Sequence, residues 1–172
     1  MRTRAVIHLL ALWVLLVSGA AHAAVLTITA AQTMAGNEPR YPAVGTPLPV
    51  QLPDDWDVTR PGHDGGVWYR ATFCKPANLA ANYLLALYIE RACSNLEVHL
   101  NGHRIFSGGR MVEPITRNCY RPQLVSLPAV LLDRSINVLD IQAQGSALRH
   151  VAARGRAGGL SVLRIGPADE MT

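Results

Sequence analysis

A cluster of polar side chains between Ser107 and Arg121 contains the residue types best suited to bind a ligand. The segment begins with Gly108-Gly109 after Ser107, and this pair lets a ligand approach the backbone closely. Guanidinium groups gathered in a small space suit a carboxylate, a phosphate or sugar hydroxyls, because each presents a planar fork of N–H donors. An ordinary solvated loop, in which Glu113 neutralises one arginine, is the alternative. We expect the loop to contact a ligand or a partner through Arg110, Glu113, Arg117, Asn118, Tyr120 and Arg121.

Two further features could contribute to the same site. Trp56 lies in a segment rich in proline, glycine and aspartate, and an exposed indole there would offer a flat platform for a sugar. A second arginine-rich loop, residues 149–156, could line the same end of the domain. We therefore add Trp56 to the predicted contacts.

Acidic residues near Trp56 raise the question of catalysis or calcium binding. Asp54, Asp55, Asp57 and Asp64 are close in sequence, and paired carboxylates beside an aromatic can serve either role. Their spacing does not match a calcium loop, and Pro-Asp-Asp is typical of a turn. We predict a solvated turn at these residues.

No other arrangement indicates an enzyme, a metal site or a cofactor. His99 and His103 are predicted to point to opposite faces of a hairpin, which excludes a shared metal site. Gly-Ser-Ala at 145–147 lacks the second glycine of a nucleophile elbow. We predict a chain without catalytic activity, metal or cofactor.

The chain contains three cysteines, which allow one disulfide. We favour Cys93 with Cys119, because this bond would clamp the base of the excursion between them and contribute roughly 3 kcal/mol by loop closure. The alternative is Cys74 with Cys93, since both are predicted to lie at strand ends. In the favoured pairing Cys74 stays free.

A hairpin centred on Asn101-Gly102 has the most definite local pattern. Apolar residues alternate before this pair and again after it, and Asn-Gly favours the positive φ angles of a type I′ turn. The predicted buried face contains Leu96, Val98, Leu100 and Ile105. The predicted cross-strand pairs are Leu100 with His103, His99 with Arg104, and Val98 with Ile105.

Further strands are predicted at 25–30, 67–73, 83–90, 123–127, 137–143 and 160–165, with a helical turn at 128–133. The strand at 83–90 is nearly all apolar, so it is predicted to be central and covered on both sides, with a buried helix as the rival. In 137–143, Leu139, Ile141 and Ala143 point inward, and Asp140 and Gln142 point outward. Many short strands with almost no helix indicate an all-β protein, an antiparallel β-sandwich or jelly roll.

The first residues have the pattern of an export signal. Arg2 and Arg4 precede an apolar run at 5–17, and Ala21-His22-Ala23 has the form that signal peptidase accepts. An uncut anchor is the alternative, although the run is shorter than the roughly 20 residues that span a bilayer. We predict a signal peptide at 1–23, a strand and irregular lead-in at 24–66, and a sandwich core at 67–167, the last two forming one domain. Cleavage leaves fourteen basic and twelve acidic residues, a net charge of +2 that does not favour nucleic acid.

Several segments resemble a known fold family. Trp68-Tyr69-Arg70, the hairpin strand ending in Asn101-Gly102, and Leu127-Pro128 resemble the galactose-binding-like jelly roll. More specifically, residues 91–98, 108–119 and 156–161 are similar to the periplasmic domain of proteobacterial membrane-bound sensor histidine kinases. That family continues into transmembrane and kinase segments, whereas this sequence ends at Thr172.

The resemblance implies a periplasmic sensory domain of a two-component receptor, with membrane contact only through segments outside this chain. A free-standing carbohydrate-binding module or a periplasmic interaction domain is the alternative. The expected partner is a small molecule, a glycan, a periplasmic protein or a second copy of the chain in a homodimer.

Overall fold

The computed structural model describes residues 25–75, 84–133 and 135–171. The predicted signal peptide at 1–23 lies outside these residues. None of the helices in the described ranges combines the length and the apolar character needed to cross a membrane.

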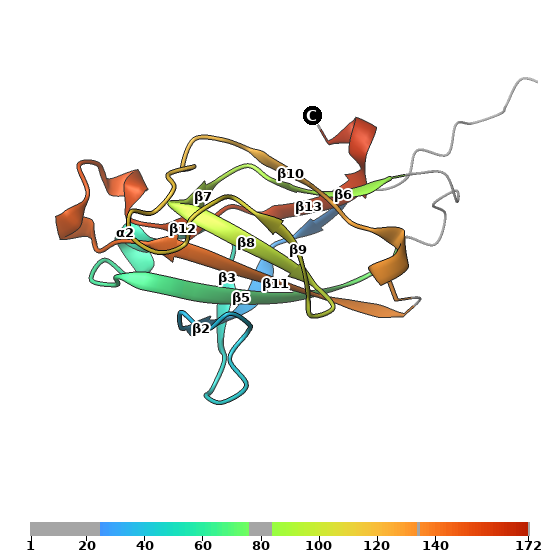
Figure 1. Cartoon of the computed structure of the whole chain (residues 1–172), viewed down its shortest axis with the longest axis horizontal. Coiled ribbons are helices and arrows are strands. Elements are labelled where there is room, and N and C mark those ends of the chain that lie inside the picture. Colours follow the sequence, from blue (N-terminus) through green and yellow to red (C-terminus); the bar gives the residue numbers. More distant parts are fainter. Residues whose placement is uncertain (1–24, 76–83, 134, 172) are drawn as a thin grey trace, which may run out of the picture.

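Two antiparallel sheets form the layers of a β-sandwich (Figure 1). The six-stranded sheet has the order β3 (Leu48–Gln51), β2 (Ala30–Ala35), β5 (Gly65–Cys74), β11 (Ile136–Gly145), β8 (Asn95–Leu100) and β9 (His103–Ser107). The four-stranded sheet has the order β1 (Leu26–Ile28), β13 (Leu163–Pro167), β6 (Leu85–Ile89) and β10 (Gln123–Ser126). The all-β sandwich predicted from strand spacing is confirmed.

A small third sheet and several short helices occupy the ends of the sandwich. The sheet contains β4 (Asp54–Asp55), β12 (Gly159–Leu160) and β7 (Ala92–Cys93). One α-helical turn, α2 (Trp56–Thr59), follows β4. The 3-10 turns are η2 (Ala129–Leu131), η3 (Leu148–His150), η4 (Arg154–Arg156) and η5 (Ala168–Glu170). The turn η2 confirms the predicted helical turn at 128–133.

The core lies between the two main sheets and follows the predicted alternation. Leu139 and Ile141 of β11 are at most 1% exposed. Ile141 lies opposite Tyr69 of β5 on one side and Val98 of β8 on the other. Strand β6 lies between β13 and β10, so the apolar segment is a central strand and not a helix.

The outer face of the six-stranded sheet is covered, which the alternation did not predict. Asp140 and Gln142 are each only 5% exposed. The loop between β2 and β3 lies against this face, where Gln142 Nε2 donates to the carbonyl of Gly36 at 3.3 Å. The Tyr41 ring of the same loop lies 6.4 Å from that of Trp68. Asp140 and Gln142 point away from the core, as predicted, but they are buried because an irregular segment covers this face of the sheet.

The hairpin has the predicted turn and part of the predicted register. Asn101 and Gly102 have φ angles of 49° and 82°, as a type I′ turn requires. A bulge between Val98 and His99 then pairs Val98 with Phe106 instead of Ile105. The extra residue is accommodated in β9, so Ile105 is only partly buried and the third predicted pair is wrong.

Two other local predictions need correction. The single strand predicted at 25–30 is two strands, because β1 pairs with β13 and β2 pairs with β5 in the opposite sheet. The predicted irregular lead-in contains β3, β4 and α2.

Candidate ligand-binding site

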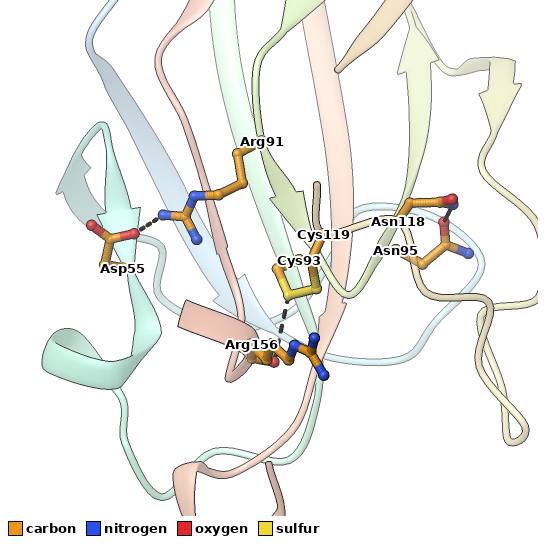
Figure 2. The surroundings of a disulfide bond; sticks show 7 residues. All are labelled: Asp55, Arg91, Cys93, Asn95, Asn118, Cys119 and Arg156. Carbon is orange, nitrogen blue, oxygen red and sulfur yellow. Dashed lines mark hydrogen bonds and ion pairs between the residues drawn. A yellow bond between two sulfur atoms is a disulfide. The ribbon is translucent and has the colours of Figure 1, made fainter. Parts of the chain in front are cut away.

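A disulfide joins Cys93 of β7 to Cys119 at the end of the 107–121 loop (Figure 2). The favoured pairing is confirmed, and the alternative with Cys74 is wrong. Cys74 is a free, exposed thiol. Cys93 is fully buried, so the bond attaches the loop to the interior of the sandwich.

Hydrogen bonds from Asn118 hold the base of this loop. Its Nδ2 donates to the carbonyl of Gly108 at 2.7 Å and to Oδ1 of Asn95 at 2.9 Å. Its backbone N–H donates to the carbonyl of Ser94 at 2.7 Å. Asn118 is 7% exposed and lies beside the disulfide in Figure 2. The amide nitrogen of this predicted contact is therefore used by the loop itself.

Beside the disulfide is a pocket with a volume of about 330 Å³, which is large enough for a small ligand. Three separate parts of the chain form its walls: the residue after Cys93, the 107–121 loop, and the segment from Ser146 to Arg156. The lining residues are Ser94, Glu113, Ile115, Arg117, Asn118, Cys119, Tyr120, Arg121, Ser146, Val151 and Arg156.

Most of the predicted contact residues come together in this pocket. Glu113, Arg117, Asn118, Tyr120 and Arg121 all line it, and Arg156 joins them from the second arginine-rich loop. Arg110 is not among the lining residues. Its backbone N–H donates to Oγ1 of Thr116 at 2.9 Å, and its carbonyl accepts from the Thr116 N–H at 3.0 Å.

Four lining residues were not named individually from the sequence: Ser94, Ile115, Ser146 and Val151, of which Ile115 and Val151 lie within the two predicted loops. Ser94 follows Cys93 directly, so the favoured disulfide could have indicated it. Ser146 was considered only as part of a nucleophile motif. Its place in the pocket depends on a hydrogen bond from its N–H to the carbonyl of Ala157 at 2.7 Å, for which the sequence has no local signal.

The arginines of the pocket differ from most others in their partners. Within the described ranges, Arg117, Arg121 and Arg156 form no ion pair with a carboxylate. Arg156 instead lies over the ring of Tyr120, with 5.7 Å between its Cζ and the ring centroid. Six arginines elsewhere are paired with an acid: Arg60, Arg70, Arg91, Arg104, Arg149 and Arg154.

Trp56 does not belong to the pocket, and its prediction as an exposed platform is wrong. The side chain is fully buried. A Cβ at Gly145 or Gly158 would overlap its ring, so these two glycines create the space that it fills. Its Nε1 donates to the Tyr69 hydroxyl at 2.6 Å.

The buried carboxylate of Asp54 completes this internal network. Tyr69 donates to Oδ2 of Asp54 at 2.6 Å, and Thr59 donates to Oδ1 at 2.6 Å. Arg60 forms an ion pair with Oδ2 at 2.8 Å. Burial, together with the nearby Asp54 carboxylate, raises the pKa of Tyr69 above its ordinary range. The solvated turn predicted here is wrong for Asp54, because Asp54 lies in strand β4, pairs with Leu160 of β12 and is fully buried.

His99 and His103 differ in how far their side chains are exposed. His103 is exposed beside the turn, whereas His99 is 6% exposed, with its ring 5.3 Å from that of Trp68. Burial lowers the pKa of His99. In the described part of the chain, no group of three or more histidine, cysteine or acidic residues is placed to hold a metal ion.

Comparison with known proteins places this geometry in a fold class. No protein-family model matches the chain, and no curated protein matches it in sequence. A β-glucuronidase from Faecalibacterium prausnitzii is 17% identical with a TM-score of 0.59, over 84% of this chain and 32% of the enzyme. The fold is that of a β-sandwich domain found in glycosidases. A β-glucuronidase from Ruminococcus gnavus is 15% identical with a TM-score of 0.61, and the match covers 84% of this chain and 30% of the enzyme.

A putative β-galactosidase from Bacteroides fragilis is 16% identical with a TM-score of 0.60, and the match covers 83% of this chain and 23% of the galactosidase. The chain therefore spans about a third or less of these enzymes. The likeness agrees with the galactose-binding-like fold predicted from the sequence. It does not bear on the resemblance to sensor histidine kinases.

Proposed function

We propose that this chain is a non-catalytic carbohydrate-binding module, with its ligand in the pocket beside the Cys93–Cys119 disulfide. The observation that carries the proposal is the pocket itself. Tyr120, 68% exposed, supplies an aromatic face, and hydroxyl, amide and guanidinium groups surround it. Such a combination of an apolar face with a few directed polar groups suits a saccharide.

The anchoring of the loops supports a binding role. The disulfide and the buried Asn118 hold the 107–121 loop, and the Ser146 N–H attaches the opposite wall to Ala157. Loops held in this way lose little conformational freedom when a ligand binds. The single carboxylate among the described lining residues, Glu113, supports binding over acid-base hydrolysis, which needs two.

The experiment is a glycan array probed with the exported protein, its disulfide intact. We expect retention on a restricted set of glycans and loss of that signal in Tyr120→Ala. Val130→Ala is the matched control, because Val130 is 90% exposed and is not a lining residue of this pocket. Absence of binding to every glycan would overturn the proposal, as would equal retention by the Tyr120→Ala variant.

A sensory domain is the second candidate. The segment that resembles sensor histidine kinases, residues 108–119, also forms one wall of the pocket, so a receptor would detect its ligand at the same place. A disulfide is consistent with a periplasmic or extracellular location. Sequencing the gene downstream of codon 172 tests this reading. Transmembrane and kinase segments there would favour the receptor, and a stop codon would favour the module.

A further inference from the structure

We infer that the pocket selects a saccharide that carries a carboxylate over its neutral counterpart. This inference rests on the proposed function, because it names the class of ligand for the same site. Its basis is the distribution of charged partners around the pocket, together with the way in which the arginines are held.

The charges that line the pocket are not balanced within the protein. Three arginines line it against one carboxylate, that of Glu113. Glu113 is not engaged with any of them, since no ion pair joins Glu113 to an arginine in the described part of the chain, and its Oε2 instead accepts from the Ile115 N–H at 3.4 Å. The lining therefore carries a formal excess of positive charge, which a bound anion would reduce.

The backbones that carry two of these arginines are fixed. The N–H of Arg156 donates to the carbonyl of Ala153 at 2.9 Å, the Arg156 carbonyl contacts Sγ of Cys93 (Figure 2), and the guanidinium lies over Tyr120. The N–H of Arg121 donates to the carbonyl of Asn118 at 3.0 Å. Guanidinium groups carried on a held backbone favour a planar carboxylate, which can accept two parallel hydrogen bonds from one arginine.

An adjoining cavity shows that the excess charge is local. This cavity, of about 420 Å³, shares Glu113, Ile115 and Ser146 with the pocket. Its other lining residues include Asp64 but no arginine, and Asp64 is paired with Arg149 and His150. A saccharide long enough to reach both would place its charged unit beside the three arginines and a neutral unit beyond Glu113.

The test compares two sugars that differ only at one carbon. Methyl glucuronide and methyl glucoside are titrated into the ¹⁵N-labelled protein, and the shifts of the pocket amides give both dissociation constants. We expect the glucuronide to bind at least about fivefold more tightly, with the difference shrinking as salt is raised, because the arginines are exposed. Glucose 6-phosphate is the third probe, to distinguish a carboxylate from a phosphate.

The variants Arg156→Gln and Arg117→Gln are expected to weaken binding of the glucuronide more than binding of the glucoside, so that the ratio of the two dissociation constants falls toward one. Arg164→Gln is the matched control, because Arg164 also lies over a tyrosine, Tyr88, at 4.6 Å, but does not line the pocket. A thermal melt of each variant checks that it is folded.

Equal affinity for the two glycosides would overturn the inference and leave the proposed function intact. Tighter binding of glucose 6-phosphate than of the glucuronide would overturn the choice of a carboxylate. If neither these sugars nor the glycan array gave binding, the proposed function itself would fail.

Discussion

Two polar clusters contact the segment 145–158, and they differ in how their charges are satisfied. In the first, Trp56 packs against Gly145 and Gly158 and joins the network of Asp54 and Tyr69. In the second, Ser146, Val151 and Arg156 line the pocket. Both clusters contain arginine, an aromatic ring and a carboxylate.

The difference lies in the partner of the arginine. Arg60 forms an ion pair with the fully buried Asp54, so the charges of the first cluster are balanced within the protein, although Arg60 Nε has no hydrogen-bond partner among the described residues. The Arg156 guanidinium lies over the ring of Tyr120 and pairs with no carboxylate among the described residues, and Arg156 lines the pocket. A cluster whose charges are paired stabilises the fold, whereas a cluster with charged groups left over is available to a ligand.

The largest expected effect is on the free energy of unfolding, and it distinguishes Trp56 from Tyr120. Trp56→Ala is expected to lower the free energy of unfolding by about 3–5 kcal/mol, because it leaves a cavity and removes a donor to Tyr69. Tyr120→Ala, at an exposed position, is expected to change it by no more than about 0.5 kcal/mol. Denaturant unfolding measures both. Similar losses for the two variants would contradict the distinction between the clusters.

The disulfide lies beside the pocket, which Cys119 lines. Its removal is expected to have the next largest effect on stability. The double variant Cys93→Ser, Cys119→Ser is expected to lower the free energy of unfolding by about 3 kcal/mol, since the unfolded chain loses a cross-link. Cys74→Ser is the control, because this thiol is exposed and free. A loss of the same size in the control would mean that the measured effect does not come from the cross-link.

A pair of tyrosine hydroxyls tests whether the hydrogen bonds of the buried network stabilise the fold. Tyr69→Phe leaves Trp56 Nε1 and Asp54 Oδ2 each without one partner, and is expected to cost about 1–3 kcal/mol. Tyr41 also has a buried hydroxyl, but with no hydrogen-bond partner in the described residues. Tyr41→Phe is therefore expected to be neutral or slightly stabilising. Equal destabilisation by both changes, measured by thermal unfolding, would show that the partners of Tyr69 do not matter.

The smallest effect is a dependence of stability on pH from His99. Burial lowers its pKa below the ordinary value of about 6.5, against the opposing influence of Glu97 and Asp140. Between the lowered pKa and about pH 6.5 the unfolded chain binds more protons than the folded protein. The contribution of His99 is therefore complete above about pH 6.5 and is lost as the pH falls through the lowered pKa.

Unfolding free energies between about pH 5 and pH 8 measure this slope, and His99→Gln is expected to flatten it. His103→Gln is the control, because its ring is exposed. An unchanged slope in His99→Gln would assign the pH dependence to another group.

Features that depend on the local backbone could be predicted from the sequence. The alternation in 137–143 indicates β11, and Asn101-Gly102 indicates the turn, because both follow from steric rules that act over a few residues. The bulge beyond that turn has no such signal. It shifts the partner of Val98 to Phe106 and leaves Ile105 partly exposed.

The candidate site was predictable in its residue types but not in its walls. The density of arginines in 107–121 indicated one side of the pocket, and the disulfide indicated where that side is attached. Ser146 and Val151 come from a distant segment that the sandwich brings to the same end. Their contribution depends on the packing of whole strands and not on their neighbours in sequence.

The sequence by itself determined the class of fold and the hairpin turn, because periodicity is a property of the chain alone. It favoured Cys93 with Cys119 but left Cys74 with Cys93 open, and the tertiary structure decided between these pairings. Only the tertiary structure decided which polar residues are buried. The loop between β2 and β3 covers Asp140 and Gln142, and the glycines at 145 and 158 admit Trp56 to the interior. Burial depends on what lies above a side chain, and that neighbour is supplied by segments far away in sequence.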